Sequence, residues 1–338
     1  MASQTADSGA LNTLLGILTS AISNTALEIT TLVGHRFPDD DVWLCFWIAK
    51  KFLPQAKNAK MVVVESGTSL LESEGDPSVL HFDTGGGKYD QHTQGKERTC
   101  SALILAENLL VEKDPGLIAL LEMVTKVDNV EPLLATEIHS AILGYPRIFH
   151  ENGDINWEKV QERVFELFEM IYAQETLRAE NREKLGEHVS WANLNNGLRV
   201  ATILWHPELR DAAYEAGADV VLFTVPKKRP KYLVGVQMNR KLKSLLSLRG
   251  VAMEMRAAEA DMRGIQVNRD DLDYVGQKGP IANWFLHDSL ALVLCGSRTH
   301  KPAEGEYTLI DPHRLTNLVS HALSKISREN VTKWHNSE

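Results

Sequence analysis

Strand-like and helical patterns alternate along residues 28–130, and this order limits the fold more than any other feature of the sequence. The β-branched run 28–34 ends at a glycine, which predicts a buried strand followed by a turn, and the broad apolar face of residues 41–52 predicts a helix. Further elements are predicted at the spacing of βαβ units: strands at 61–65 and 79–83, then helices at 99–110 and 115–127. We therefore predict an α/β fold with a mostly parallel sheet, in which ligands bind at the carboxyl ends of the strands.

The length of the chain indicates two domains. At roughly 150 residues per domain, 338 residues are enough for two hydrophobic cores. A charged helical stretch at about 154–187, with few strand formers, separates two α/β patterns. We expect four parts: an N-terminal tail at 1–25, a first domain at 26–150, a helical connector at 151–190, and a smaller second α/β domain at 191–330 with strands at 198–204, 218–226 and 232–238.

The charge balance argues against one class of partner. Lys and Arg number 36 against 45 Asp and Glu, a formal net charge of −9, so the overall field repels the long polyanions that a duplex-coating protein binds. Short anionic ligands in a local pocket remain compatible with this charge. Cys45, Cys100 and Cys295 are far apart, which argues against a thiolate zinc site or a disulfide framework and favours a reducing, cytoplasmic compartment. The apolar stretch 11–22 is interrupted by polar residues and is too short to cross a bilayer.

The sharpest chemical feature is the segment 34–41, Gly-His-Arg-Phe-Pro-Asp-Asp-Asp, at the junction of the first strand and the first helix. The imidazole of His35 and the carboxylates of Asp39 and Asp41 lie in one loop, and such ligands suit a hard or borderline divalent cation such as Mn²⁺ or Mg²⁺. The alternative is that the aspartates cap the helix and complement its dipole. One aspartate is enough for a cap, so three aspartates with a histidine favour a metal site.

Two further segments carry weaker signals. In residues 79–92 a strand delivers Asp83 to its carboxyl end, a glycine triplet allows a tight turn, and Asp90 and His92 follow. Taken alone, the glycines are equally compatible with a flexible loop. Asp128, in a Val-Asp-Asn sequence, ends a predicted helix, where the alternative is a simple C-terminal turn.

Together these segments resemble the DHH phosphoesterase superfamily, which includes RecJ nucleases, oligoribonucleases and manganese pyrophosphatases. The residues that match its motifs are His35, Asp39, Asp41, Asp83, the triplet Asp90-Gln91-His92 and Asp128. The stretches FDTGGGKYDQHT, TCSALILAE and VDN are most similar to the Myg-type exonuclease group. The resemblance is specific over residues 28–130 and more diffuse in the second domain, in LRGVAMEMRAAEA and WFLHDSLALVLCGSRTH.

The resemblance implies a DHH-type catalytic domain with two metal ions and a smaller C-terminal substrate-binding domain. His35 and Asp39 would hold one metal, with Asp83 as a bridge. Asp41 and Asp128 would hold the other metal. Two cations on the order of 3.5–4 Å apart clamp a phosphoryl group, lower the pKa of a bridging water and stabilise the attacking and leaving oxygens. The implied activity is therefore phosphate ester hydrolysis by two-metal water activation.

The signature departs from the superfamily at Gln91, which stands where the family has a histidine ligand of the second metal. An amide oxygen can bind Mn²⁺ or Mg²⁺, but it is neutral, so the second of the two sites should be weaker. His92 matches the histidine that faces the substrate phosphate, and Asp90 would orient its neighbours. In the second domain, Arg298 and His300 are candidates for binding a phosphate or nucleotide, with a solvated loop as the alternative.

These inferences predict a metal-dependent hydrolase of the phosphodiesterase or exonuclease class, which cleaves short single-stranded oligonucleotides or nucleotides. The alternative is a catalytically impaired relative, weakened at Gln91, that binds a nucleotide as a regulatory protein. A pyrophosphatase is less favoured, because the second domain lacks an evident Arg-Lys-Lys anion cradle. We expect no membrane association, and a homodimer is left open.

Other aromatic and charged residues have structural interpretations. Trp43 and Trp47 are four residues apart on the first predicted helix and are expected to pack in the core. Glu254, Arg256 and Glu259 follow a helical pattern, which predicts a solvated face with Arg256 and Glu259 as an i, i+3 pair.

Overall fold

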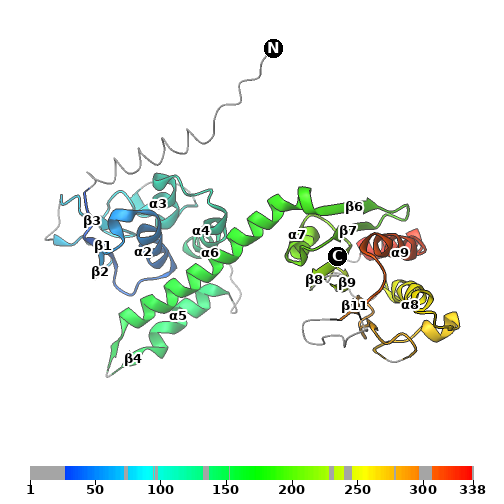
Figure 1. Ribbon diagram of the computed structural model, residues 1–338. Helices are drawn as coiled ribbons and strands as arrows, with labels where there is room; N and C mark the ends of the chain where they lie inside the picture. Colours follow the sequence, from blue (N-terminus) through cyan, green and yellow to red (C-terminus); the bar gives the residue numbers. More distant parts are fainter. Residues whose placement is uncertain are drawn as a thin grey trace, which may run out of the picture. The chain divides into compact units, whose positions relative to one another are not determined.

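The computed structural model describes residues 27–71, 75–93, 95, 98–131, 137–151, 153–227, 232–239, 246–277, 279–296 and 307–336, and the expected N-terminal tail lies outside them. The chain divides into two compact units, of which the first ends at Leu177 and the second begins at Arg178 (Figure 1). This division falls within the long helix α6 (Trp157–His188). Each unit combines helices with a sheet, so the prediction of a mixed α/β chain is confirmed. Within the residues given above, no helix is both long and apolar enough to cross a bilayer.

The N-terminal unit is built on a three-stranded sheet in the order β2-β1-β3. Its strands are all parallel: β1 (Thr31–His35), β2 (Lys60–Val64) and β3 (Val79–His81). Helix α2 (Asp40–Phe52) packs directly against the central strand, since a Cβ atom at Gly34 would lie 2.3 Å from Cγ1 of Val42. A glycine at this position therefore lets β1 and α2 approach closely on either side of the loop that joins them.

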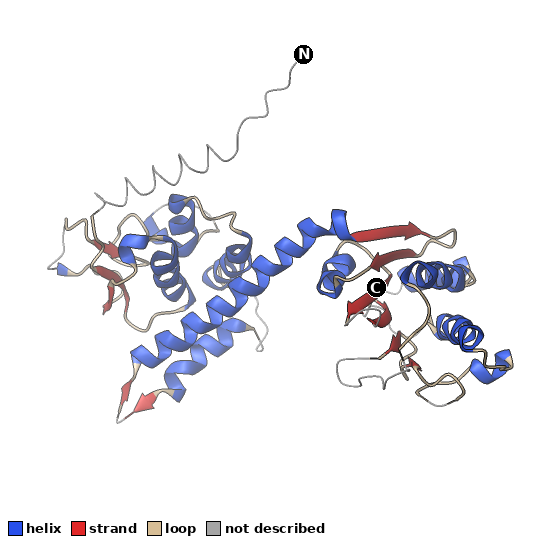
Figure 2. Ribbon diagram, viewed as in Figure 1, coloured by secondary structure: helices blue, strands red, loops and turns tan. Residues whose placement is uncertain are grey.

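Helices complete the N-terminal unit (Figure 2). After α2 they are α3 (Ser101–Leu109), α4 (Pro115–Asp128), α5 (Ile138–Ile148) and the first part of α6, with a hairpin of β4 (His150–Glu151) and β5 (Asp154–Ile155) before α6. The helices predicted in this part of the chain correspond to α2, α3 and α4. Trp43 and Trp47 are buried against Phe165 and Phe168 of α6, so their predicted packing in the core is confirmed.

The C-terminal unit contains a six-stranded sheet in the order β10-β11-β9-β8-β7-β6. Its strands are β6 (Val189–Asn193), β7 (Arg199–Ile203), β8 (Val220–Pro226), β9 (Tyr232–Met238), β10 (Trp284–Leu286) and β11 (Leu292–Cys295). Among these described strands, β7 and β8 form the single parallel pair, so the parallel pattern of the N-terminal unit does not continue here. The sequence predicted β7, β8 and β9 but not β6, β10 and β11.

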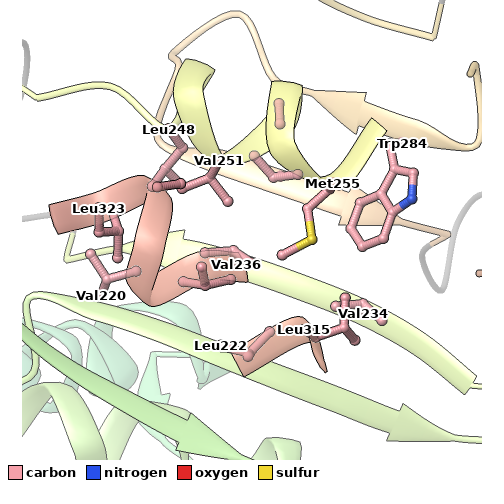
Figure 3. Close-up of a cluster of buried hydrophobic side chains, with 14 of the residues drawn as sticks. Val220, Leu222, Val234, Val236, Leu248, Val251, Met255, Trp284, Leu315 and Leu323 are labelled. Atoms are coloured by element: carbon pink, nitrogen blue, oxygen red, sulfur yellow. The ribbon is translucent and has the colours of Figure 1, made fainter. Parts of the chain in front are cut away.

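Helices α8 (Arg249–Arg263) and α9 (Pro312–Ser324) contribute with this sheet to one buried cluster (Figure 3). Val234 and Val236 of β9 belong to it together with Met255 of α8 and Leu315 of α9, and all four side chains are buried. The C-terminal unit also contains the second part of α6, α7 (Arg210–Glu215) and α10 (Arg328–His335).

Arg256 and Glu259 on α8 contradict the prediction of a solvated face, because neither side chain is exposed. Arg256 donates to the backbone carbonyl oxygens of Leu272 and Tyr274 at 2.8 Å each and to that of Trp284 at 2.9 Å. The guanidinium thus satisfies carbonyl groups of the segment that follows α8. Burial lowers the pKa of Arg256, although an arginine keeps its charge in a protein.

Glu259 is also not the ion-pair partner of Arg256. It pairs with Arg263, one helical turn later, at 2.8 Å. Its Oε2 atom accepts from Nε1 of Trp284 at 3.1 Å and from the hydroxyl of Thr308 at 2.6 Å. Helical spacing shows that residues share a face but not which later segment covers that face, so the prediction was wrong.

Candidate metal centre

The candidate site lies where the parallel strands of the N-terminal unit end. His35 is the last residue of β1, and Asp83 follows shortly after β3. Asp39 is the N-cap of α2, and its Oδ1 atom accepts from the amides of Asp41 and Val42 at 3.1 and 3.2 Å. Because β1 and β3 are neighbouring parallel strands, their carboxyl ends bring these side chains to one edge of the sheet.

One group at this edge consists of an imidazole and two carboxylates. Nε2 of His35 lies 3.1 Å from Oδ2 of Asp83 and 3.6 Å from Oδ2 of Asp39. One ligand atom from each residue lies within 4.8 Å of the others, a spacing that one ion can span when each metal–ligand distance is about 2.0–2.6 Å. Nδ1 of His35 donates to the carbonyl oxygen of Arg36 at 3.0 Å, which orients Nε2 toward the carboxylates.

The charges of this group depend on one another. Hydrogen bonds with Asp39 and Asp83 raise the pKa of His35 to about 10, although burial opposes the shift. Burial raises the pKa of Asp39, but the hydrogen bond and charge of His35 outweigh it and hold the pKa below its ordinary value. At neutral pH an imidazolium therefore compensates the two carboxylates, and a divalent cation that binds here has to replace its proton.

The loop after β3 has a constrained backbone. Asp83 has a φ of 51°, in the left-handed region that aspartate and asparagine adopt more readily than most residues. Gly85 and Gly86 follow with φ of 74° and 64°, where glycine avoids the strain of a side chain. Oδ2 of Asp90 accepts from the amide of Gly86 at 2.9 Å. The glycines therefore build a tight turn, which the carboxylate of Asp90 closes.

Asp90 also positions the histidine of the signature. Its Oδ1 atom accepts from the amide of His92 at 3.1 Å, and Nε2 of His92 lies 3.4 Å from Oδ1 of Asp83. Asp83, Asp90 and His92 form a second group with the spacing of a metal site, and this group shares Asp83 with the first one. The His92 side chain is 74% exposed, so it can reach a ligand that binds beside Asp83.

Gln91 and Asp128 lie at the same edge. Nε2 of Gln91 donates to Oδ1 of Asp83 at 2.7 Å and lies 3.5 Å from Oδ1 of Asp128. Oε1 of Gln91 accepts from the hydroxyl of Ser101. Burial, together with the charges of Asp83 and Asp39, raises the pKa of Asp128 to about 6. Asp128, the last residue of α4, is therefore part of a crowded set of acidic groups.

Asp41 has a structural role that its motif does not reveal. Its carboxylate is buried, and Oδ2 and Oδ1 accept from the amides of Ser101 and Ala102 at 2.8 Å each. It thereby caps the N-terminus of α3, whose own N-cap residue, Cys100, makes no capping hydrogen bond with its side chain. Burial raises the pKa of Asp41 well above its ordinary range.

Asp40 and His139 form a pair that no motif indicated. Asp40 is buried, and its Oδ2 atom lies 2.5 Å from Nδ1 of His139 on α5. Among the described residues, Oδ1 of Asp40 has no hydrogen-bond partner. The two residues are 99 positions apart, so the spacing of local motifs held no signal for this pair.

The donor atoms fit one divalent cation well. Carboxylate oxygens suit Mg²⁺ and Mn²⁺, and an imidazole nitrogen beside them favours Mn²⁺. The set implied for a second cation fits less well, because the oxygens of Asp41 accept backbone hydrogen bonds and Gln91 presents a nitrogen to the carboxylates. Arg298 and His300, the candidates in the second domain, lie outside the described residues.

Comparisons with known proteins find a distant likeness among solved structures. No family model and no curated protein matches the chain. Among solved structures, the chain is similar to a DHH-domain protein described as a member of the s1p family of ribosomal proteins. The alignment has 12% sequence identity and a TM-score of 0.30, and it covers 88% of this chain and 87% of that chain. A likeness at this level does not assign an activity, so the chemistry has to be argued from the donor atoms themselves.

Proposed function

We propose that this chain is a metal-dependent phosphoesterase of the DHH type, which hydrolyses phosphodiester bonds in short oligonucleotides or nucleotides. The observation that supports it most is the convergence of His35, Asp39 and Asp83 at the carboxyl end of a parallel sheet. An imidazole and two carboxylates in one cluster are suitable ligands for a hydrolytic Mn²⁺ or Mg²⁺ ion. In this proposal, residues 26–150 form the catalytic domain and residues 191–330 bind the substrate. Residues 151–190 connect these two domains.

Hydrogen bonds to the backbone orient the side chains of the cluster. A divalent cation at this cluster would polarise a phosphoryl oxygen and lower the pKa of a bound water. His35 is oriented by the carbonyl of Arg36, and Asp39 by its capping bonds to α2. In this proposal His92, whose exposed ring lies beside Asp83, would bind an oxygen of the substrate phosphate.

The charge and the cysteines of the protein support the proposed substrate and compartment. The net charge of −9 opposes long polyanions more than short single strands with few phosphates. Arg298 and His300 are proposed to contact such a strand in the second domain. Cys45, Cys100 and Cys295 are buried thiols, which fits a reducing, cytoplasmic compartment.

The test of this function is hydrolysis of 5′-labelled RNA and DNA oligomers of graded length with Mn²⁺, by the protein and by its Asp39→Asn variant. Asparagine keeps the N-cap of α2, since its side-chain oxygen can accept the same amide bonds, but it removes the carboxylate charge. We expect turnover by the protein and a loss of at least about a hundredfold in the variant. Equal turnover by both would indicate a contaminating nuclease, and turnover by neither would overturn the proposal.

The environment of Gln91 favours one alternative function. Its amide nitrogen, rather than a metal-binding atom, faces Asp83, which suits a protein that binds a nucleotide without cleaving it. Such a regulatory protein would retain nucleotide binding in the same assay while releasing no product. Binding measured by fluorescence of a labelled dinucleotide, with turnover measured in parallel, separates the two functions.

The raised pKa of His35 predicts that Mn²⁺ binds more tightly as pH rises. Because this pKa is about 10, the imidazole is protonated at neutral pH and each bound ion has to displace one proton. We expect the Kd for Mn²⁺ to fall by about tenfold per pH unit between about pH 6.5 and 8.5, as one-proton exchange requires. Calorimetric titration in buffers of different ionisation enthalpy counts the released proton. A Kd that does not change with pH would remove His35 from the ligand set.

The raised pKa of His35 also affects folding stability in the absence of a metal ion, and this stability falls as pH rises, whereas metal binding becomes tighter. The pKa of His35 is higher in the fold than its ordinary value of 6.5, so the folded state binds the proton more tightly than the unfolded chain. This stabilisation of the folded state is fully present below the pKa that His35 has in the unfolded chain. It is lost as the pH rises through the pKa that His35 has in the folded protein.

A further inference from the structure

The amide of Gln91 lies between two carboxylates of the centre. Its nitrogen donates to Oδ1 of Asp83 at 2.7 Å and reaches Oδ1 of Asp128 at 3.5 Å. The same nitrogen lies 3.3 Å from Nε2 of His92. An amide nitrogen offers two N–H donors and no ligand atom for a cation. Gln91 is 8% exposed, so these contacts are largely shielded from bulk water.

Asp83 divides its two oxygens between different partners. Oδ2 faces Nε2 of His35 at 3.1 Å, within the group that fits a cation. Oδ1 faces the amide nitrogen of Gln91 at 2.7 Å. A carboxylate that bridges two cations presents one oxygen to each of them. Here the second oxygen meets an N–H group instead.

Both oxygens of the Asp41 carboxylate already serve a structural contact. Its two oxygens accept from the amides of Ser101 and Ala102 at 2.8 Å each, at the N-terminus of α3. An ion held by Asp41 would have to share an oxygen that already accepts a backbone N–H, which leaves one lone pair on each oxygen. Two of the residues implied for a second cation, Asp41 and Gln91, therefore already serve other contacts.

The orientation of the Gln91 amide follows from its neighbours. Ser101 lies 2.7 Å from the carbonyl oxygen of Tyr89 and also contacts Oε1 of Gln91, although a hydroxyl has one proton to donate. A reversed amide would relieve this competition by donating to Ser101. It would also place Oε1 against the carboxylate of Asp83 at the 2.7 Å now spanned by a hydrogen bond, where two acceptors repel. The observed orientation is thus the one in which the amide nitrogen donates to the carboxylates.

We propose that this centre binds a single divalent cation at His35, Asp39 and Asp83, and that the amide of Gln91 takes the place of a second cation by donating to Asp83 and Asp128. The proposal rests on the metal binding of the proposed function. It changes the chemistry, because the amide supplies hydrogen bonds but no positive charge. Charge on the leaving oxygen then has to be met by side chains such as His92 rather than by a second ion.

The test is the stoichiometry of Mn²⁺ in the full chain, which does not depend on turnover. Calorimetric titration counts the ions, and electron paramagnetic resonance distinguishes an isolated Mn²⁺ from an exchange-coupled pair. We expect one equivalent and the hyperfine pattern of an isolated ion for the protein. The Gln91→His variant, with an imidazole nitrogen near the carboxylates, and the nearly isosteric Gln91→Glu variant should each bind a second equivalent. Asp76→Asn, at an exposed carboxylate outside both acidic groups, is the control and should remain at one.

The outcomes separate this proposal from the function on which it rests. Two equivalents in the unchanged protein would overturn the single-cation centre and leave a metal-dependent phosphoesterase intact. A single equivalent in both folded Gln91 variants would show that the amide does not exclude the second ion. No binding by the unchanged protein would overturn the proposed function as well as this inference.

Discussion

Replacing Asp83 by asparagine is expected to lower phosphodiester hydrolysis on the order of 10³-fold. Asp83 is the residue common to both acidic groups, with Oδ2 at 3.1 Å from His35 and Oδ1 at 2.7 Å from Gln91. A metal ion contributes several kcal/mol of charge stabilisation, and each 1.36 kcal/mol corresponds to about a tenfold change in rate. Asparagine is the appropriate substitution because it also tolerates the φ of 51° at this position.

The control for this variant is Asp76→Asn in the same unit. Asp76 is exposed, and its Oδ1 atom accepts from the amide of Ser78 at 2.8 Å, a bond that an asparagine oxygen can also accept. We expect its hydrolysis rate and Mn²⁺ affinity to equal those of the unchanged protein. Both variants should be assayed with Mn²⁺ on the same labelled oligomers. An Asp83→Asn rate within tenfold of the unchanged protein would show that Asp83 does not hold the ion.

Replacing Arg256 by alanine is expected to destabilise the C-terminal unit by about 4 kcal/mol, because three backbone carbonyl oxygens lose a charged donor. The side chain is fully buried and donates to the carbonyl oxygens of Leu272, Tyr274 and Trp284. Each carbonyl that loses its donor in the interior costs about 1–3 kcal/mol. The truncation also leaves a cavity between α8 and the segment that follows it.

Hydrogen exchange of the α8 amides measures this loss within the unit, where a global unfolding curve of a two-unit chain would not isolate it. Arg182→Ala is the matched control, because the Arg182 side chain is 54% exposed and pairs with Glu215, whose side chain is 39% exposed. An exposed pair contributes at most about 1 kcal/mol. A comparably small loss for Arg256→Ala would mean that water replaces the guanidinium at these carbonyls.

The parts of the fold that sequence patterns predicted are those governed by local chemistry. The β-branched run that became β1 and the apolar face of α2 each determine an element through neighbours a few positions away. The short strands β10 and β11 were missed because such short runs of residues have little periodicity of their own, and β11 pairs with β9, a strand far earlier in the sequence. The burial of Arg256 was missed for a similar reason, since its partners are carbonyls of a later segment.

In the candidate site, too, local sequence features were predictable and contacts between distant segments were not. His35 and Asp39 could be grouped from the sequence because they lie in one loop after a predicted strand, and the resemblance to the DHH superfamily added Asp83 to them. The partners of Gln91 could not be predicted, because the direction of an amide depends on the positions of Asp83 and Ser101 in space. Residue types thus indicated the chemistry, while the hydrogen-bond partners of each atom required the structure.

Because Asp41 caps α3, any fragment of the chain that is meant to retain the metal centre has to include α3. Asp41 and its amide partners Ser101 and Ala102 are separated by 60 and 61 positions, so the loop after β1 and the start of α3 are completed only when both are present. A fragment that ended before α3 would still contain His35, Asp39 and Asp83. In that fragment the Asp41 carboxylate would lack its two donors and would add an uncompensated charge to an acidic cluster. A minimal version of the metal centre therefore has to extend through α3.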